Sequence, residues 1–211
     1  MDTLIAPPAP HAGAPARQSI TVLGLDPSFA NFGMVRATID IVTQAVVITD
    51  MRLCQTEKDD NKQVRASSDR VRRARESAEV LDQMGKGVSF AFAEVPHGSQ
   101  SAISALGAGV CIGLLASFSR TVPLIEMSEQ EVKLGSHGMK NATKRQVIEW
   151  AYGMHPDAPG WHFDRAKLKK GERHLPQHNE HLADAIAAIH AGIKTQEFQR
   201  LRSSLKSLMG I

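Results

Sequence analysis

The sequence has few cysteines and no long hydrophobic segment, and both shortages restrict the class of protein. Its two cysteines, Cys54 and Cys111, have apolar sequence neighbours, and neither belongs to a CxxC motif. We therefore expect neither a disulfide scaffold nor a cysteine-based metal site, and we do expect a reducing compartment. No apolar run approaches the ~20 residues that a transmembrane helix requires, and the N-terminus lacks the layout of a signal peptide. A cytoplasmic protein with no membrane partner is expected.

Aromatic residues make up only 5% of the 211 residues, whereas 42% are hydrophobic, which suffices for the core of one ordinary domain. The net charge of +3, with a pI near 9.0, permits a nucleic-acid partner without requiring one. We expect a disordered, proline- and alanine-rich tail over residues 1–18 and one folded domain over residues 19–195. Residues 196–211 are expected to form a basic tail or a short helix.

The first folded stretch reads as three strands that form an antiparallel meander. The strands are predicted over Ser19–Asp26, Gly33–Ile41 and Ala45–Cys54, with a turn at Asn31–Gly33. Asp26 stands where an apolar strand should continue, and a carboxylate there is costly unless a cation or a donor meets it. A simple turn-forming Asp-Pro-Ser is the alternative reading of this position.

A second strand ends in the same way. The apolar run Val88–Ala93 is followed by Glu94, and two buried strands that both end in acids are less expected by chance than one. The helix predicted before this strand takes its N-cap from residues 67–69. Its apolar residues recur at helical spacing: Val71, Ala74, Ala78 and Leu81.

Small residues dominate the next helix, predicted over Ser101–Ser119. Its glycines lower helix propensity unless close packing requires them, so this helix is expected to lie tightly against the sheet or against another subunit. A strand over Val122–Met127 follows, then helices that begin near Ser128 and after Asn141–Thr143.

The last predicted helix follows Asn179, a good N-cap residue. Its core stripe is Leu182, Ile186, Ile189 and Ile193. His181 and Asp184 are three residues apart and project from neighbouring positions near its start, and Glu180 can reach the same surface.

Basic residues gather in three places. Residues 62–75 hold six cations against one acid, which indicates either phosphate contact or an ordinary solvated face: Lys62, Arg65, Arg70, Arg72, Arg73 and Arg75. Residues 133–145 hold four cations and no acid: Lys133, Lys140, Lys144 and Arg145. The third place is the polar loop over residues 153–178, whose histidines lack the tight spacing of zinc ligands: His155, His162, His174 and His178.

Three acids remain in unusual places, namely Asp26, Glu94 and Asp184. Brought together they would repel one another unless a cation lay among them, and such hard oxygen ligands select Mg²⁺ or Mn²⁺. Two such ions can support phosphodiester cleavage. His181 could ligate a second ion or carry a proton, or it could simply face solvent at the helix start.

The order of these elements is similar to that of the RNase H-like fold, an α/β fold with a mixed five-stranded sheet flanked by helices, in which two further strands join an antiparallel three-strand meander. Within it, the sequence resembles the RuvC family of Holliday junction resolvases along residues 19–195. The resemblance rests on the order and spacing of five segments: GLDPSFANFGMV (24–35), SSDRVRRARESAEVL (67–81), FAFAEVPHGSQSAISALGAG (90–109), EVKLGSHGMKNATKRQV (131–147) and EHLADAIAAIHAG (180–192).

The resemblance implies an endonuclease that nicks four-way DNA junctions with Mg²⁺, or Mn²⁺ in its place, and a homodimer with the helix from Ser101 near its two-fold axis. The implied metal ligands are Asp26, Glu94, His181 and Asp184, with Glu180 as the alternative to His181. Lys144 is expected in the catalytic set. The expected DNA-binding residues are Ser28, Arg70, Arg73, His97, Lys133, Lys140 and Arg145.

Two positions depart from the family pattern. Ser28 replaces a glycine, and His97 replaces an aromatic residue that stacks on an unpaired base, where histidine stacks more weakly. Both a bacterial cell and a phage-infected host fit the sequence, and the N-terminal tail and His97 favour a phage-type member.

Three other functions are alternatives to a junction resolvase. A relaxed nuclease acting on Y-forks and flaps shares all the site residues, whereas a non-catalytic junction-binding module would not need four competent ligands. An actin-like ATPase would require a second glycine-rich phosphate loop and a longer chain.

Overall fold

The computed structural model describes residues 18–61, 63–97, 101–164 and 175–210. Five strands form one sheet: β1 (Ser19–Asp26), β2 (Asn31–Asp40), β3 (Val46–Gln55), β4 (Phe90–Glu94) and β5 (Leu124–Met127). The helices are α1 (Ala66–Gly85), α2 (Ala102–Phe118), α3 (Glu129–Ser136), α4 (Lys144–Met154), the 3₁₀ turn η1 (Gln177–Asn179), α6 (Glu180–Gly192) and α7 (Gln196–Met209). In the described part of the chain, no helix is long and apolar enough to span a membrane.

The sheet is mixed, with the strand order β3-β2-β1-β4-β5. β1, β2 and β3 pair antiparallel, which confirms the predicted meander, and β4 and β5 add to β1 in parallel. Parallel pairing puts the carboxyl ends of β1 and β4 at one edge of the sheet. Asp26 and Glu94 are the last residues of these two strands, so both acids lie at that edge.

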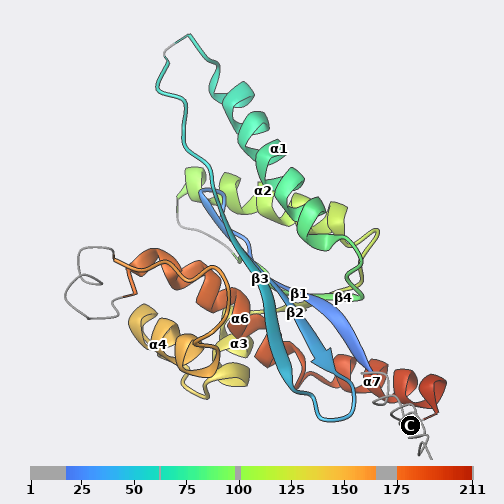
Figure 1. Cartoon of the computed structure of the whole chain (residues 1–211). Helices are drawn as coiled ribbons and strands as arrows, with labels where there is room; N and C mark the ends of the chain where they lie inside the picture. The colour runs from blue at the N-terminus through green and yellow to red at the C-terminus, as the bar shows by residue number, and fades with distance from the viewer. Residues whose placement is uncertain (1–17, 62, 98–100, 165–174, 211) are drawn as a thin grey trace, which may run out of the picture.

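Helices cover both faces of the sheet, α1 and α2 on one face and α3, α4 and α6 on the other (Figure 1). Alternate residues of β1 therefore enter two separate cores. Val22 belongs to the larger core under α6, and Leu23 and Leu25 belong to the smaller core under α1 and α2.

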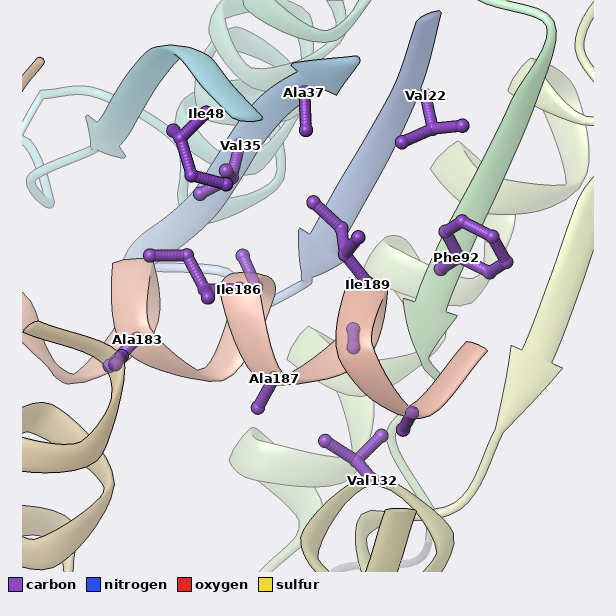
Figure 2. Close-up of a cluster of buried hydrophobic side chains, with 14 of the residues drawn as sticks. Val22, Val35, Ala37, Ile48, Phe92, Val132, Ala183, Ile186, Ala187 and Ile189 are labelled. Atoms are coloured by element: carbon purple, nitrogen blue, oxygen red, sulfur yellow. The ribbon is translucent and has the colours of Figure 1, made fainter. Parts of the chain in front are cut away.

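Helix α6 is the centre of the larger core. Ile186 and Ile189 point from it toward the strands, while Ala187 and the α3 residue Val132 lie on its other side (Figure 2). Nine of the thirteen residues of α6 are buried, so the helix is enclosed on almost every side. Its position is therefore fixed by packing rather than by helix propensity.

Two predicted helix starts have the expected caps. Ser128 and Glu131 form a capping box at α3, and Thr143 and Gln146 form one at α4. The C-terminal segment forms α7, with Phe198 fully buried.

Several local predictions were wrong. Asn31 and Phe32 pair with β3, so the turn after β1 comprises residues 27–30. Helix α1 begins at Ala66 without a side-chain cap, because Asp69 instead accepts hydrogen bonds from Arg72 and from the backbone of Asp59. Val71, expected in the core, is 58% exposed.

Asn179 precedes α6 as expected, but its side chain does not cap the helix. The buried amide bonds the backbone N–H and carbonyl of His162 and the carbonyl of Pro176. The predicted tail at residues 1–18 lies almost wholly outside the described residues, and so do Lys62 and residues 165–174 of the polar loop.

Candidate active site

Two glycines, one on β1 and one on β2, allow α6 to lie directly on these strands beside Asp26. A Cβ on Gly24 would lie 2.1 Å from the carbonyl oxygen of Ala185, and a Cβ on Gly33 would lie 2.0 Å from that of His181. Gly33 is also the register partner of Asp26. The absence of these side chains therefore brings the first turn of α6 next to the end of β1.

The closest contact at this edge joins Asp26 and His181. The Oδ2 atom of Asp26 lies 2.6 Å from the Nδ1 atom of His181, and the two side chains are 14% and 23% exposed. Burial raises the pKa of Asp26, and the hydrogen bond and charge of His181 offset that rise only in part. Burial is the largest single influence on His181 and would lower its pKa, but the hydrogen bond to Asp26 and the charges of Asp26 and Glu180 together outweigh burial and raise the pKa.

Glu94 and Asp184 complete an acidic cluster with Asp26. Burial, followed by the charges of Asp26 and Glu129, raises the pKa of Glu94 to about 7. Burial and the charges of Asp26 and Glu94 raise the pKa of Asp184 well above its usual value. The charge of Asp26 thus acts on both Glu94 and Asp184, and that of Glu94 acts on Asp184, so the cluster would gain from a cation.

Each of two lysines at this edge is bound by a glutamate. Lys133 donates to Glu129 one turn earlier on α3, and the Nζ atom of Lys144 lies 2.6 Å from the Oε1 atom of Glu180. The Lys133 ammonium offsets part of the rise in the pKa of Glu94 and Asp184, which places its charge beside the acidic cluster.

A cavity of about 780 Å³ opens beside Glu94, between the ends of β4 and β5 and the α3–α4 segment. Three of the predicted DNA-binding residues line it: His97, Lys133 and Lys140. His97 is exposed and follows the strand-end acid by three residues, as the sequence predicts.

The remaining predicted DNA-binding residues do not line this cavity. Ser28 is half-buried in the turn after β1, and Arg70 lines a second cavity near the start of α1. Arg145 is bound to Glu149 and to the carbonyl of Leu175.

Arg73 has a structural role that the sequence did not predict. Its guanidinium lies 4.2 Å from the ring centre of Phe29 and donates to the hydroxyl and carbonyl of Thr56. It thereby ties α1 to the turn after β1. Contact between Arg73 and DNA stays a prediction.

The donors at this edge suit a hard divalent ion. Asp26, Glu94 and Asp184 supply carboxylate oxygens, and His181 supplies an imidazole nitrogen. As the side chains are placed, no three histidine, cysteine, aspartate or glutamate residues of the described chain are grouped closely enough to hold a metal. Asp26 faces His181 instead, so a metal would have to separate this pair.

The histidines of the polar loop form pairs rather than a ligand group. The Nε2 atoms of His155 and His190 lie 2.8 Å apart, and the rings of His162 and His178 are in contact. His174 lies outside the described residues.

Comparison with known proteins identifies the architecture. A scan against protein-family models and a search of curated proteins find no match. Among solved structures, the chain is similar to Thermus thermophilus RuvC in complex with a Holliday junction substrate, with a TM-score of 0.58 and 19% identity over 88% of this chain and 97% of that one.

The chain has the fold of RuvC. A second structure, of T. thermophilus RuvC alone, matches with a TM-score of 0.55 and 19% identity over 90% of this chain and 97% of the other. The RuvC-like, RNase H-like α/β fold expected from the sequence is therefore confirmed.

Proposed function

We propose that this chain is a divalent-metal-dependent endonuclease that resolves four-way DNA junctions by paired nicks. The observation that carries the proposal is the convergence of Asp26, Glu94, His181 and Asp184 at one edge of a RuvC-like sheet. The same edge carries Lys133 and Lys144, which supply positive charge for a phosphate backbone.

The acidic cluster would hold Mg²⁺, or Mn²⁺ in its place, through Asp26, Glu94 and Asp184, with His181 as a further ligand. Divalent ions held there would supply an activated water and offset the charge that develops on the phosphate. Burial and, after it, the charges of neighbouring acids raise the pKa values of Glu94 and Asp184, and a cation among the acids would offset both effects, which supports this assignment.

The chain would act as a homodimer. Much of the apolar surface of α2 is exposed in the described part of the chain, with Ile103 78%, Leu106 46% and Ile112 43% exposed. A helix that is apolar on all sides is normally buried, so a second copy is the natural cover for this face. Two symmetric sites would then meet the two opposed strands of a four-way junction.

The test is cleavage of labelled synthetic DNAs, comparing a four-way junction, a Y-fork, a flap and a linear duplex with Mg²⁺, Mn²⁺ or EDTA. We expect symmetric paired nicks in the junction with either metal and none with EDTA. Asp26→Asn should lower the rate by about a hundredfold or more while junction binding persists, because the amide keeps the shape but not the charge.

Asp50→Asn serves as the matched control, since Asp50 is an exposed acid of β3 bound to Arg52. Its cleavage rate should equal that of the wild type. Equal cutting of forks and flaps would instead indicate a general branch nuclease, a result that the weaker stacking of His97 would explain. Binding without cutting would indicate a non-catalytic module, and no binding to any branched DNA would contradict the proposal.

A further inference from the structure

Each lysine at the candidate site is bound by a glutamate: Glu129 lies outside the predicted ligand set, and Glu180 is the predicted alternative to His181. Glu129 binds Lys133, and Glu180 binds Lys144. In the described part of the chain, no ion pair joins either lysine to Asp26, Glu94 or Asp184, although the Lys133 charge acts on the last two. The glutamates thus keep the ammonium groups beside the acidic cluster rather than within it.

The first pair lies on a helix whose position is fixed at both ends. The capping box at Ser128 fixes the start of α3. Near its end, a Cβ on Gly135 would lie 2.7 Å from the Cβ of Ala191, so α3 and α6 are in close contact. The backbone of Lys133 is therefore immobilised, and Glu129 determines where its flexible four-carbon side chain ends.

The second pair joins the first residues of two different helices. Glu180 begins α6 and Lys144 begins α4, where a capping box at Thr143 fixes the backbone. The side chain of Glu180 is only 15% exposed, whereas that of Lys144 is 63% exposed. Glu180 is thus the less mobile member of the pair, and it holds the largely solvent-exposed Lys144 side chain at the first turn of α6.

Two other ion pairs of this chain are more exposed. In the pairs Arg145–Glu149 and Arg52–Asp50, both side chains are at least 40% exposed, and such pairs contribute little. Each pair at the site has one well-covered member, since the side chain of Lys133 is 23% exposed and that of Glu180 is 15% exposed. Glu129 and Glu131 both lie in the first turn of α3, where the helix dipole favours acids, but Glu131 closes the capping box with Ser128 whereas Glu129 binds Lys133.

We propose that Glu129 and Glu180 are positioning residues, which hold Lys133 and Lys144 where the backbone of a bound nucleic acid passes the acidic cluster. The inference rests on the proposed nuclease function and deepens it. Neither glutamate touches the reacting phosphate; each acts through its lysine. Lysine side chains that are already held in place lose less conformational freedom when the phosphate binds. The expected gain is therefore in the cleavage rate of the bound complex.

Double-mutant cycles test this assignment. Glu129→Gln and Glu180→Gln should each lower the single-turnover rate on a four-way junction by about tenfold, with little change in the junction dissociation constant. In chains that already carry Lys133→Met or Lys144→Met, the matching glutamine variant should have no further effect. Glu131→Gln makes the same charge change in the same turn of α3 and should cleave at the wild-type rate.

Three results would overturn the proposal. Additive losses within a cycle would give the glutamate a role of its own, such as metal ligation by Glu180. Faster cleavage by Glu129→Gln or Glu180→Gln would mean that the glutamates only repel phosphate. A loss confined to the dissociation constant would assign them to DNA binding.

A second readout does not depend on cleavage. The rate at which an amine-acylating reagent modifies each lysine can be followed by mass spectrometry. Lys133 should react several-fold faster in Glu129→Gln and Lys144 in Glu180→Gln, while the exposed Lys86 serves as reference. If the wild type cleaves no DNA, the nuclease proposal fails, whereas unchanged lysine reactivity would show that the pairs themselves do not form.

Discussion

Helices α2 and α6 cover opposite faces of the same sheet and are both built largely from alanine, glycine and aliphatic residues, but they are buried to very different extents. Nine of the thirteen residues of α6 are buried, whereas only Gly107, Cys111, Leu115 and Phe118 are buried among the seventeen of α2. The buried residues of α2 form one narrow stripe. Most of its apolar surface faces outward.

Small residues serve different purposes at the two helices. At α6, the strand glycines Gly24 and Gly33 let β1 and β2 touch the helix backbone, which brings His181 and Asp184 to the acids of β1 and β4. In α2, a Cβ on Gly109 or Gly113 would meet nothing within 4 Å in the single chain. The contrast teaches that α6 completes its packing within the chain, whereas α2 leaves an apolar face for a partner, which we propose is a second copy.

The largest effect is expected from a substitution that disrupts the close contact between α6 and β2. In Gly33→Ala the new Cβ would meet the carbonyl of His181 at 2.0 Å, and the helix start would have to move. The free energy of unfolding should fall by about 3 kcal/mol or more, and junction cleavage should be lost. Denaturant unfolding of both proteins measures the change.

Gly153→Ala is the matched control, since its Cβ would meet nothing within 4 Å in α4. There the loss of a helical glycine should stabilise the chain by roughly 0.5–1 kcal/mol. Equal effects of the two substitutions would contradict the close contact between α6 and β2.

The next effect concerns α2. Ile103→Asp places a charge on the exposed apolar face and should weaken self-association by about a hundredfold, with secondary structure unchanged. Sedimentation equilibrium measures the dissociation constant. Val47→Asp, at a β3 residue that is 59% exposed, is the control and should leave association intact. A wild-type chain that stays monomeric would refute the proposed dimer.

The smallest expected effect is a pH dependence of stability that arises from a buried histidine of α6 and has no counterpart in α2. Burial, with the nearby charges of His155 and Lys194, lowers the pKa of His190 on α6 to about 4. Between the usual pKa of 6.5 and about 4 the unfolded chain therefore binds a proton that the folded chain does not, and stability falls as pH falls through this window. α2 contains no histidine.

His190→Gln should remove about 2 kcal/mol of this acid-induced loss, seen as a shallower pH dependence of the unfolding free energy between pH 6.5 and 4. Above pH 6.5 the dependence should match that of the wild type. Parallel curves throughout the window would mean that His190 is not held neutral by its burial.

Much of the fold could be predicted because its signals are local. Alternating and continuous apolar runs marked the strands, and Ser128 and Thr143 marked two helix starts. Asp26, Glu94 and Asp184 could be singled out because acids rarely end or interrupt apolar segments. The resemblance to the RuvC family predicts that these acids form one site, and the parallel pairing of β1 and β4 places Asp26 and Glu94 at one edge of the sheet.

The features that were predicted wrongly or not at all depend on contacts between residues far apart in the sequence. The turn predicted at Asn31–Gly33 is part of β2, and Gly33 is constrained by the backbone of His181 far along the chain. Asp69 and Asn179 have good capping chemistry, yet each is used to bind another segment. The pairing of Lys144 with Glu180 likewise needs α4 and α6 in place, whereas the sequence predicts Glu180 only as the alternative ligand to His181.

The most direct test of the central claim is anomalous diffraction from crystals soaked in Mn²⁺. The account predicts manganese peaks within ligand distance of Asp26, Glu94 and Asp184, with the His181 ring turned away from its contact with Asp26 or bound to the ion. Manganese bound only elsewhere, or no manganese at concentrations that support cleavage, would contradict the assignment of this edge as the metal-dependent active site.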